Sequence, residues 1–118
     1  MSIVTIGVCS VAETQGRFVA ALKGEATAQQ PRVDFLSFDL LHKVITPKRW
    51  AILEAMAGQG AMTMREVARR VGRDFKGVHA DIHALIMAGL LNWQTIGTES
   101  GVSFPYEAVH LDVTMAAA

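Results

Sequence analysis

Residues 63–89 constrain the fold most, because their signals place two helices with a very short turn between them. Thr63 and Glu66 stand three residues apart, which is the spacing of a capping box at the start of a helix. Gly72 is typical of a residue that ends a helix, and Asp74 is a favoured N-cap for a second helix that runs almost to the end of the segment. The pattern predicts two consecutive helices whose mutual orientation is set by the turn.

Both helices carry an apolar stripe at spacings of three and four residues, which is the period of one helix face. In the first helix, the residues expected to face inward are Met64, Val67, Ala68 and Val71. In the second helix, they are Phe75, Val78, Ile82, Leu85 and Ile86. The two stripes predict that the helices pack against a common core.

Two further helices are predicted before this pair. Thr46 is an N-cap residue and Pro47 suits the first helical position, so a helix is expected from Pro47 to about residue 57. Ser37 is expected to cap a shorter helix before it. Apolar residues occupy most of the circumference of the longer helix, which indicates that it is covered on more than one side. These residues are Trp50, Ile52, Leu53 and Met56.

After residue 89 the hydrophobic period falls to two, which predicts a β-hairpin. Its strands are expected at 91–96 and 102–106 around a turn at 97–101. Pro105 would place the second of these strands at a sheet edge, because proline has no N–H to donate. A last strand is expected at 109–113.

The N-terminal part predicts a strand at Ile3–Val8, a helix at 11–22 and a polar linker at 24–32. Three helices followed by a hairpin, with a short turn between the last two helices, is the order of a winged helix-turn-helix. We therefore expect an α+β protein with a winged helix-turn-helix DNA-binding domain over 33–115. An N-terminal strand-helix extension over 1–32 is expected to contribute to dimerisation.

The charges are unevenly distributed, although the 118 residues carry 11 basic and 11 acidic side chains and no net charge. Most lysines and arginines fall within residues 42–83, and none follows residue 83. A basic stretch in a neutral chain is the electrostatic pattern of a nucleic-acid-binding face. The competing interpretation is a solvated helical surface on a protein-interaction domain, because this topology also serves such domains.

In a winged helix-turn-helix, the second helix of the pair lies in the major groove of double-stranded DNA. Gly77 and Ala80 are expected at the centre of its exposed face, where they offer no bidentate hydrogen bonds to bases. The predicted wing carries Glu99 and no lysine or arginine. Phosphate contacts and DNA shape are therefore expected to dominate binding. The candidate DNA-binding residues are Lys48, Arg49, Arg65, Arg69, Arg70, Arg73, Lys76, Gly77, Ala80 and His83.

Several of these stretches resemble a family of winged-helix regulators from archaea and bacteria that is related to MarR- and ArsR-like proteins. They are 46–50 (TPKRW), 65–74 (REVARRVGRD), Val78-His79 with Asp81, Gly89-Leu90 and Pro105-Tyr106. The resemblance covers roughly residues 35–113 and implies that the helix at 74–88 binds DNA. Gly77 and Ala80 depart from it, because the family tends to have larger polar or basic residues there.

The resemblance implies a DNA-binding transcriptional regulator that acts as a repressor or autoregulator. Some members of the family are encoded beside toxin genes. The alternative function is therefore an antitoxin-like interaction module that neutralises a toxin or another partner protein through its N-terminal part. An enzyme is not expected, since no nucleophile–base pair, paired carboxylates or phosphate-binding glycine loop is present.

Neither a cofactor nor a metal is expected. His79 and His83 stand four residues apart, as zinc ligands do, but the glutamate that follows the first histidine of a zinc protease motif is absent. His79 is instead expected to be half buried against the preceding helix. Metal or redox sensing by Cys9 with His110 rests only on the presence of these residues.

The expected location is the cytoplasm, and the expected assembly is a homodimer. The single cysteine has no second cysteine with which to form an internal disulfide, and no secretion signal or membrane-spanning run is apparent. Residues 3–22 and the strand at 109–113 are expected to form or support the symmetric interface. The rival interpretation is that they only cover the core of their own chain.

Overall fold

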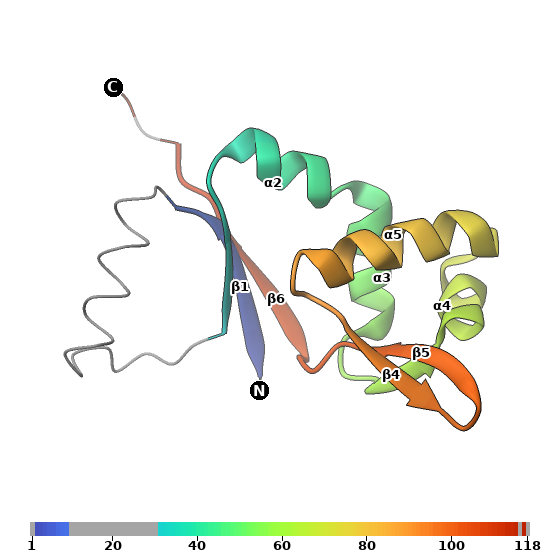
Figure 1. The fold of residues 1–118 in the computed structure, drawn as a ribbon. Helices are drawn as coiled ribbons and strands as arrows, with labels where there is room; N and C mark the ends of the chain where they lie inside the picture. Colours follow the sequence, from blue (N-terminus) through green and yellow to red (C-terminus); the bar gives the residue numbers. More distant parts are fainter. Residues whose placement is uncertain (1, 10–30, 116, 118) are drawn as a thin grey trace.

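The computed structural model of the chain describes residues 2–9, 31–115 and 117. The helix expected at 11–22 and nearly all of the linker expected at 24–32 lie outside the described residues. Figure 1 shows a sheet on one side of the domain and a group of helices with a β-hairpin on the other. No helix in the described part of the chain combines the length and apolar character that crossing a bilayer requires.

The described elements follow one another in the order β1 (Ile3–Val8), β2 (Arg32–Phe35), α2 (Phe38–Val44), α3 (Pro47–Met56), β3 (Ala61–Thr63), α4 (Met64–Val71), α5 (Phe75–Met87), β4 (Asn92–Ile96), β5 (Glu99–Ser103) and β6 (Ala108–Asp112). The arrangement of α3, α4 and α5 followed by the β4–β5 hairpin is the predicted winged helix-turn-helix, in an α+β fold.

Each described helix begins where the sequence pattern predicts. The caps are Ser37 for α2, Thr46 for α3, Thr63 for α4 and Asp74 for α5, and each side chain accepts a hydrogen bond from the backbone N–H three residues later. Helix α4 ends at Gly72, whose φ of 67° is left-handed. The chain therefore turns directly from α4 into the cap of α5.

The β4–β5 hairpin differs from the expectation at its second strand. The predicted turn at 97–101 is shorter, because Gly97 has a φ of 64° and supports a tight turn before β5 begins at Glu99. Strand β5 lies between β3 and β4, so it is the central strand of its sheet and not an edge. Pro105 lies beyond its end, and the prediction of an edge strand at 102–106 is wrong.

Strand β3 was not predicted from the sequence. Gly101 of β5 lies directly against its backbone. β3 pairs with β5 in antiparallel register, with Met62 opposite Val102. A Cβ atom on Gly101 would lie 2.8 Å from the Met62 carbonyl oxygen and 2.6 Å from Ile96 Cδ1. Glycine is required here by the close approach of neighbouring strands, whereas the sequence pattern suggested a turn.

The second sheet is parallel and joins the two ends of the described chain. Its order is β2-β1-β6, with Ile6 of β1 opposite Val33 of β2 and Leu111 of β6. Strand β2 was not predicted, because it lies where the polar linker was expected to end. Val4 and Ile6 are buried in the same hydrophobic core as the helices. Strand β1 therefore covers the core of its own chain.

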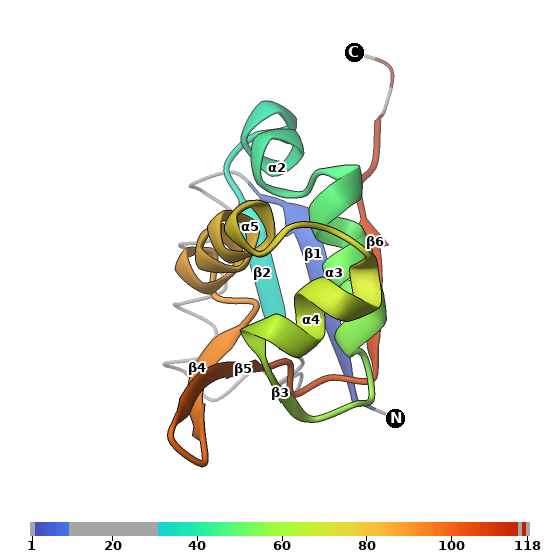
Figure 2. The same ribbon diagram turned by 90° about the vertical axis from the view of Figure 1, so that its right-hand side faces the viewer.

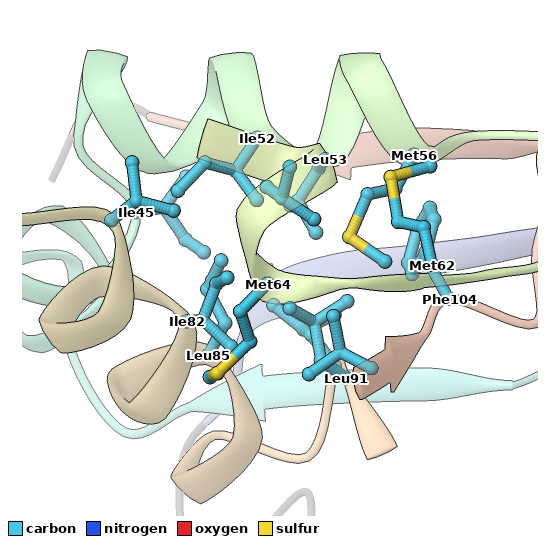
Figure 3. Packing of buried hydrophobic residues seen from close by; sticks show 14 of the residues in the cluster. Ile45, Ile52, Leu53, Met56, Met62, Met64, Ile82, Leu85, Leu91 and Phe104 are labelled. Carbon is cyan, nitrogen blue, oxygen red and sulfur yellow. The ribbon is translucent and has the colours of Figure 1, made fainter. Parts of the chain in front are cut away.

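Helix α3 lies at the centre of this core. Its Ile52, Leu53 and Met56 are fully buried and pack among side chains of α5, β3 and the segment after β5 (Figure 3). Trp50 and Ala57 are partly buried at the edge of the same cluster. The prediction that α3 is covered on more than one side is confirmed, and one chain supplies that cover.

Candidate nucleic-acid interface

Helix α5 and the β4–β5 hairpin project on the same side of the domain, as Figure 2 shows at its left. The inner face of α5 is held in the core by Val78, Ile82 and Leu85, which are fully buried. Its outer face is open. We call this surface the α5 face, and its exposed residues are Phe75, Lys76, His79, Ala80, His83 and Met87.

The α5 face differs in part from the predicted one. Lys76, Ala80 and His83 lie on it as expected, whereas Gly77 is only partly exposed. A Cβ on Gly77 would lie 3.2 Å from side-chain atoms of Arg73 and Asp74, so these residues flank it. Ala80, and not Gly77, is therefore the small residue at the centre of the face.

Phe75 was expected to face inward and His79 to be half buried against the preceding helix, and both expectations are wrong. The Phe75 side chain is 47% exposed, and His79 is exposed beside it, with ring centroids 5.8 Å apart. Side chains on a helix point towards its N-terminus. The first residue of α5 therefore projects beyond the turn that packs on α4, and His79 follows it on the same side.

Arg49 and Arg73 converge on one carboxylate of α5. Arg49 Nε lies 3.0 Å from Asp81 Oδ1, and Arg73 Nη1 lies 2.8 Å from Asp81 Oδ2. Arg49 also donates to the carbonyls of Lys43 and Val44 at 3.2 and 3.1 Å. Asp81 thus ties the start of α3 and the α4–α5 turn to the middle of α5.

The side chains of this triad are 16–22% exposed, so they are screened only in part from water. Burial raises the pKa of Asp81, but hydrogen bonds from Arg49 and Arg73 outweigh it and hold that pKa below its ordinary value. The carboxylate is therefore ionised and offsets both arginines. Their geometry fits a role in positioning α5.

Arg69 and Arg70 are likewise bound to a carboxylate of their own helix. Glu66 accepts hydrogen bonds from Nε of each arginine at 2.9 Å and a further one from Arg69 Nη2. These hydrogen bonds lower the pKa of Glu66 to about 2, and the bonds from Arg69 have the largest effect. The two positive charges on this side of α4 are therefore partly offset.

The remaining predicted cations are Lys48, Arg65 and Lys76. All three are exposed and form no ion pair with another described residue. Arg65 also lines a cavity of about 330 Å³ between α4, α5 and the hairpin, together with His79 and Glu99. Sequence reasoning missed this grouping, because it depends on how the hairpin folds back against α5. Within the described residues, no three histidine, cysteine or acidic side chains gather as metal ligands.

The sequence model of the HVO_A0114 family matches residues 44–111, which is more than half of the 118-residue chain. The chain belongs to the HVO_A0114 family. The match runs from the end of α2 almost to the end of β6, so it includes the α5 face and the hairpin of this HVO_A0114 protein. No curated protein matches the chain.

Solved structures share the fold of this HVO_A0114 protein. A predicted DNA-binding transcriptional regulator from E. coli is 19% identical, with a TM-score of 0.54 over 83% of this chain and 86% of that one. NolR from Sinorhizobium fredii is 16% identical, with a TM-score of 0.52 over 84% of this chain and 81% of that one. Similarity at these identities shows the fold alone.

Proposed function

We propose that this HVO_A0114 protein is a cytoplasmic transcriptional regulator that binds double-stranded DNA and represses its target genes, its own gene included. The observation that carries the proposal is the α5 face, an exposed helix surface next to the β4–β5 hairpin. A major groove is wide enough to admit an α-helix. The description of the E. coli protein as a predicted DNA-binding transcriptional regulator, on a similar fold, supports the proposal.

The distribution of charge supports binding through phosphate contacts. Lys76 lies on the α5 face and Arg65 lines the cavity beside it, so both flank a helix in the groove. Each phosphate neutralised contributes about −0.9 to the slope of log K against log salt. With Lys48 as a third unpaired cation, the slope expected is about −3 per chain. Of the basic residues predicted to contact phosphates, we therefore retain the three that form no ion pair.

Arg65→Ala is expected to weaken binding to all duplexes alike and to lower the salt slope by about one, because it removes an unpaired cation. Arg69→Ala is the matched control: it removes the same charge from the same helix, but that charge is already partly offset by Glu66, which Arg69 shares with Arg70. Binding of the full chain to a 30-base-pair duplex from its own upstream region, and to a random duplex, measures both variants across a salt series. An equal loss of DNA affinity in the two variants would show that paired and unpaired arginines contact phosphates alike. Absence of binding to either duplex at low salt would favour the antitoxin-like alternative.

We also propose that the protein binds DNA as a homodimer. Three unpaired cations are few for one chain, and two-fold symmetry doubles the phosphate contacts. The interface was expected at residues 3–22 with the strand at 109–113; of these, β1 is the central strand of its sheet and pairs on both sides with strands of its own chain. Among the described strands, β2 and β6 are the outer strands of that sheet, where pairing with a second copy would occur.

Sedimentation of the full chain tests the assembly. A dimer is expected at micromolar concentrations, with dissociation on dilution. A single monomeric species at high micromolar concentration, in the presence and absence of duplex DNA, would contradict the proposal.

A further inference from the structure

The α5 face carries few side chains that can form hydrogen bonds with bases. Phe75, Ala80 and Met87 have no polar side-chain atom that donates, and Lys76 lies in the first turn of the helix. The remaining residues are His79 and His83, one turn apart on the exposed side. Positions four apart in a helix are separated by about 6 Å along its axis, so the two imidazoles are far enough apart to reach different base pairs.

We propose, on the basis of the DNA-binding function above, that His79 and His83 contact base edges in the major groove and take up protons as they bind. The His83 ring lies beside Trp93 of β4, with centroids 6.2 Å apart, and the His79 ring lies beside Phe75. An aromatic neighbour limits the rotation of each imidazole before DNA arrives. Ordering these side chains on binding therefore costs less conformational entropy.

The fixed charges around His79 are of both signs, so the phosphates of bound DNA supply the main attraction for a positive ring. His79 shares its cavity with Arg65 of α4 and Glu99 of β5, and Lys76 lies one turn before it on α5. Asp81 is bound to Arg49 and Arg73. Glu99 is thus the single described carboxylate that lines the same cavity as His79.

The chemistry of imidazole then links binding to pH. A neutral imidazole offers one donor and one acceptor, whereas the protonated ring offers two donors. Guanine presents two acceptors, N7 and O6, in the major groove, and the phosphates around the groove favour a positive ring. Histidine titrates between about pH 5 and 8, so affinity should rise as the pH falls through this range. A preference for G·C pairs under the two histidines is expected as well.

The test compares wild type with the double variant His79→Gln/His83→Gln at fixed ionic strength. The first probe is a defined G·C-rich 30-base-pair duplex at pH 6.0 and pH 8.0. Wild type is expected to bind about tenfold more tightly at pH 6.0, in line with uptake of about one proton across the titration range of histidine. The double variant is expected to show less than a twofold difference between the two pH values, because a glutamine side chain does not titrate in this range.

The remaining histidines provide a matched control. The chain has four histidines, and His42 and His110 lie outside the α5 face on α2 and β6. His42→Gln/His110→Gln removes the same number of titrating rings and is expected to keep the tenfold pH effect. Thermal unfolding of each variant checks the fold, and exposed positions such as these tolerate glutamine.

A second probe, a random-sequence duplex pool enriched at pH 6.0, tests base contact directly. Wild type is expected to enrich a G-containing motif that the double variant does not. Equal wild-type affinities at the two pH values, a pH effect that survives in the double variant, or the same enriched motif in both proteins would overturn the inference and leave the proposed function standing. No binding at either pH would instead overturn the proposed function.

Discussion

Replacing Asp81 with alanine is expected to lower the free energy of unfolding by about 2–3 kcal/mol. Asp81 bridges Arg49 of α3 and Arg73 of the turn at 3.0 and 2.8 Å. Arg73 Nη1 is buried, and among the described residues it has no hydrogen-bond partner apart from this ion pair. The variant leaves that charge without a counterion, which costs more than the loss of the attraction alone. DNA affinity should fall with stability, because the triad positions α5.

Two controls separate the charge from the packing. Asp81→Asn keeps an acceptor oxygen of similar shape and is expected to lose less stability. The double variant Arg73→Met/Asp81→Ala also removes the Arg73 charge that Asp81→Ala leaves unpaired. Its stability should therefore recover in part relative to Asp81→Ala. Urea unfolding of wild type, Arg73→Met, Asp81→Ala and the double variant measures the coupling between the two residues. Single-variant losses that simply add in the double variant would show that the pair contributes no coupling energy.

The pH dependence of this effect has a defined sign. Arg49 and Arg73 hold the pKa of Asp81 below its ordinary value, against the opposing effect of burial. The contribution of Asp81 is therefore fully present above the ordinary aspartate pKa of about 4, and it is lost as the pH falls towards the lowered pKa. The stability difference between wild type and Asp81→Ala should shrink below about pH 4. A difference that grows on acidification would contradict the ion-pair account.

The helices could be predicted from the sequence because helix capping is a local interaction. Thr46 with Pro47, Thr63 with Glu66, and Asp74 each specify a helix start within four residues, and the structure has a cap at each. The turn between α4 and α5 follows from Gly72 in the same way. No knowledge of the rest of the chain is needed for these assignments.

The missed strands depend on partners distant in the sequence. Strand β3 has three residues and is defined by its pairing with β5, about forty positions later. Gly101 resembled a turn residue because its true reason, the close approach of the β3 backbone, is invisible in the local pattern. Strand β2 likewise exists through its pairing with β1.

The sequence predicted which residues surround the candidate site, but not how their side chains pair with one another. The basic stretch identified the residues around α4 and α5, but a count of charges does not show which cations are already paired. Arg49 and Asp81 are 32 positions apart and meet only because α3 packs on α5. His79 was expected to be half buried against the preceding helix, whereas it is exposed on the α5 face.

The central claim, that the α5 face binds duplex DNA, makes Ala80 the most informative position. Ala80 is exposed at the middle of the face, between His79 and the turn that carries His83. A glutamate there would place a carboxylate against the phosphates and base edges of the groove. Like charges juxtaposed across an interface cost several kcal/mol. Ala80→Glu is therefore expected to reduce DNA affinity by more than tenfold.

Ala51→Glu provides the matched control for this variant. Ala51 is exposed on α3, away from Arg49, which faces α5, and one turn after Lys48, so a glutamate there can offset at most the phosphate contact of Lys48. Both variants add one negative charge to an exposed helical alanine, so both should keep the melting temperature of wild type. Only a charge on the α5 face should block the groove.

The deciding measurement is the dissociation constant of wild type, Ala80→Glu and Ala51→Glu for one 30-base-pair duplex at one salt concentration. The proposed function predicts a loss of more than tenfold for Ala80→Glu and a smaller loss for Ala51→Glu, of at most about fivefold, which is the contribution of one phosphate contact near ~0.15 M salt. Wild-type affinity in Ala80→Glu, or equal losses in the two variants, would contradict DNA binding through the α5 face.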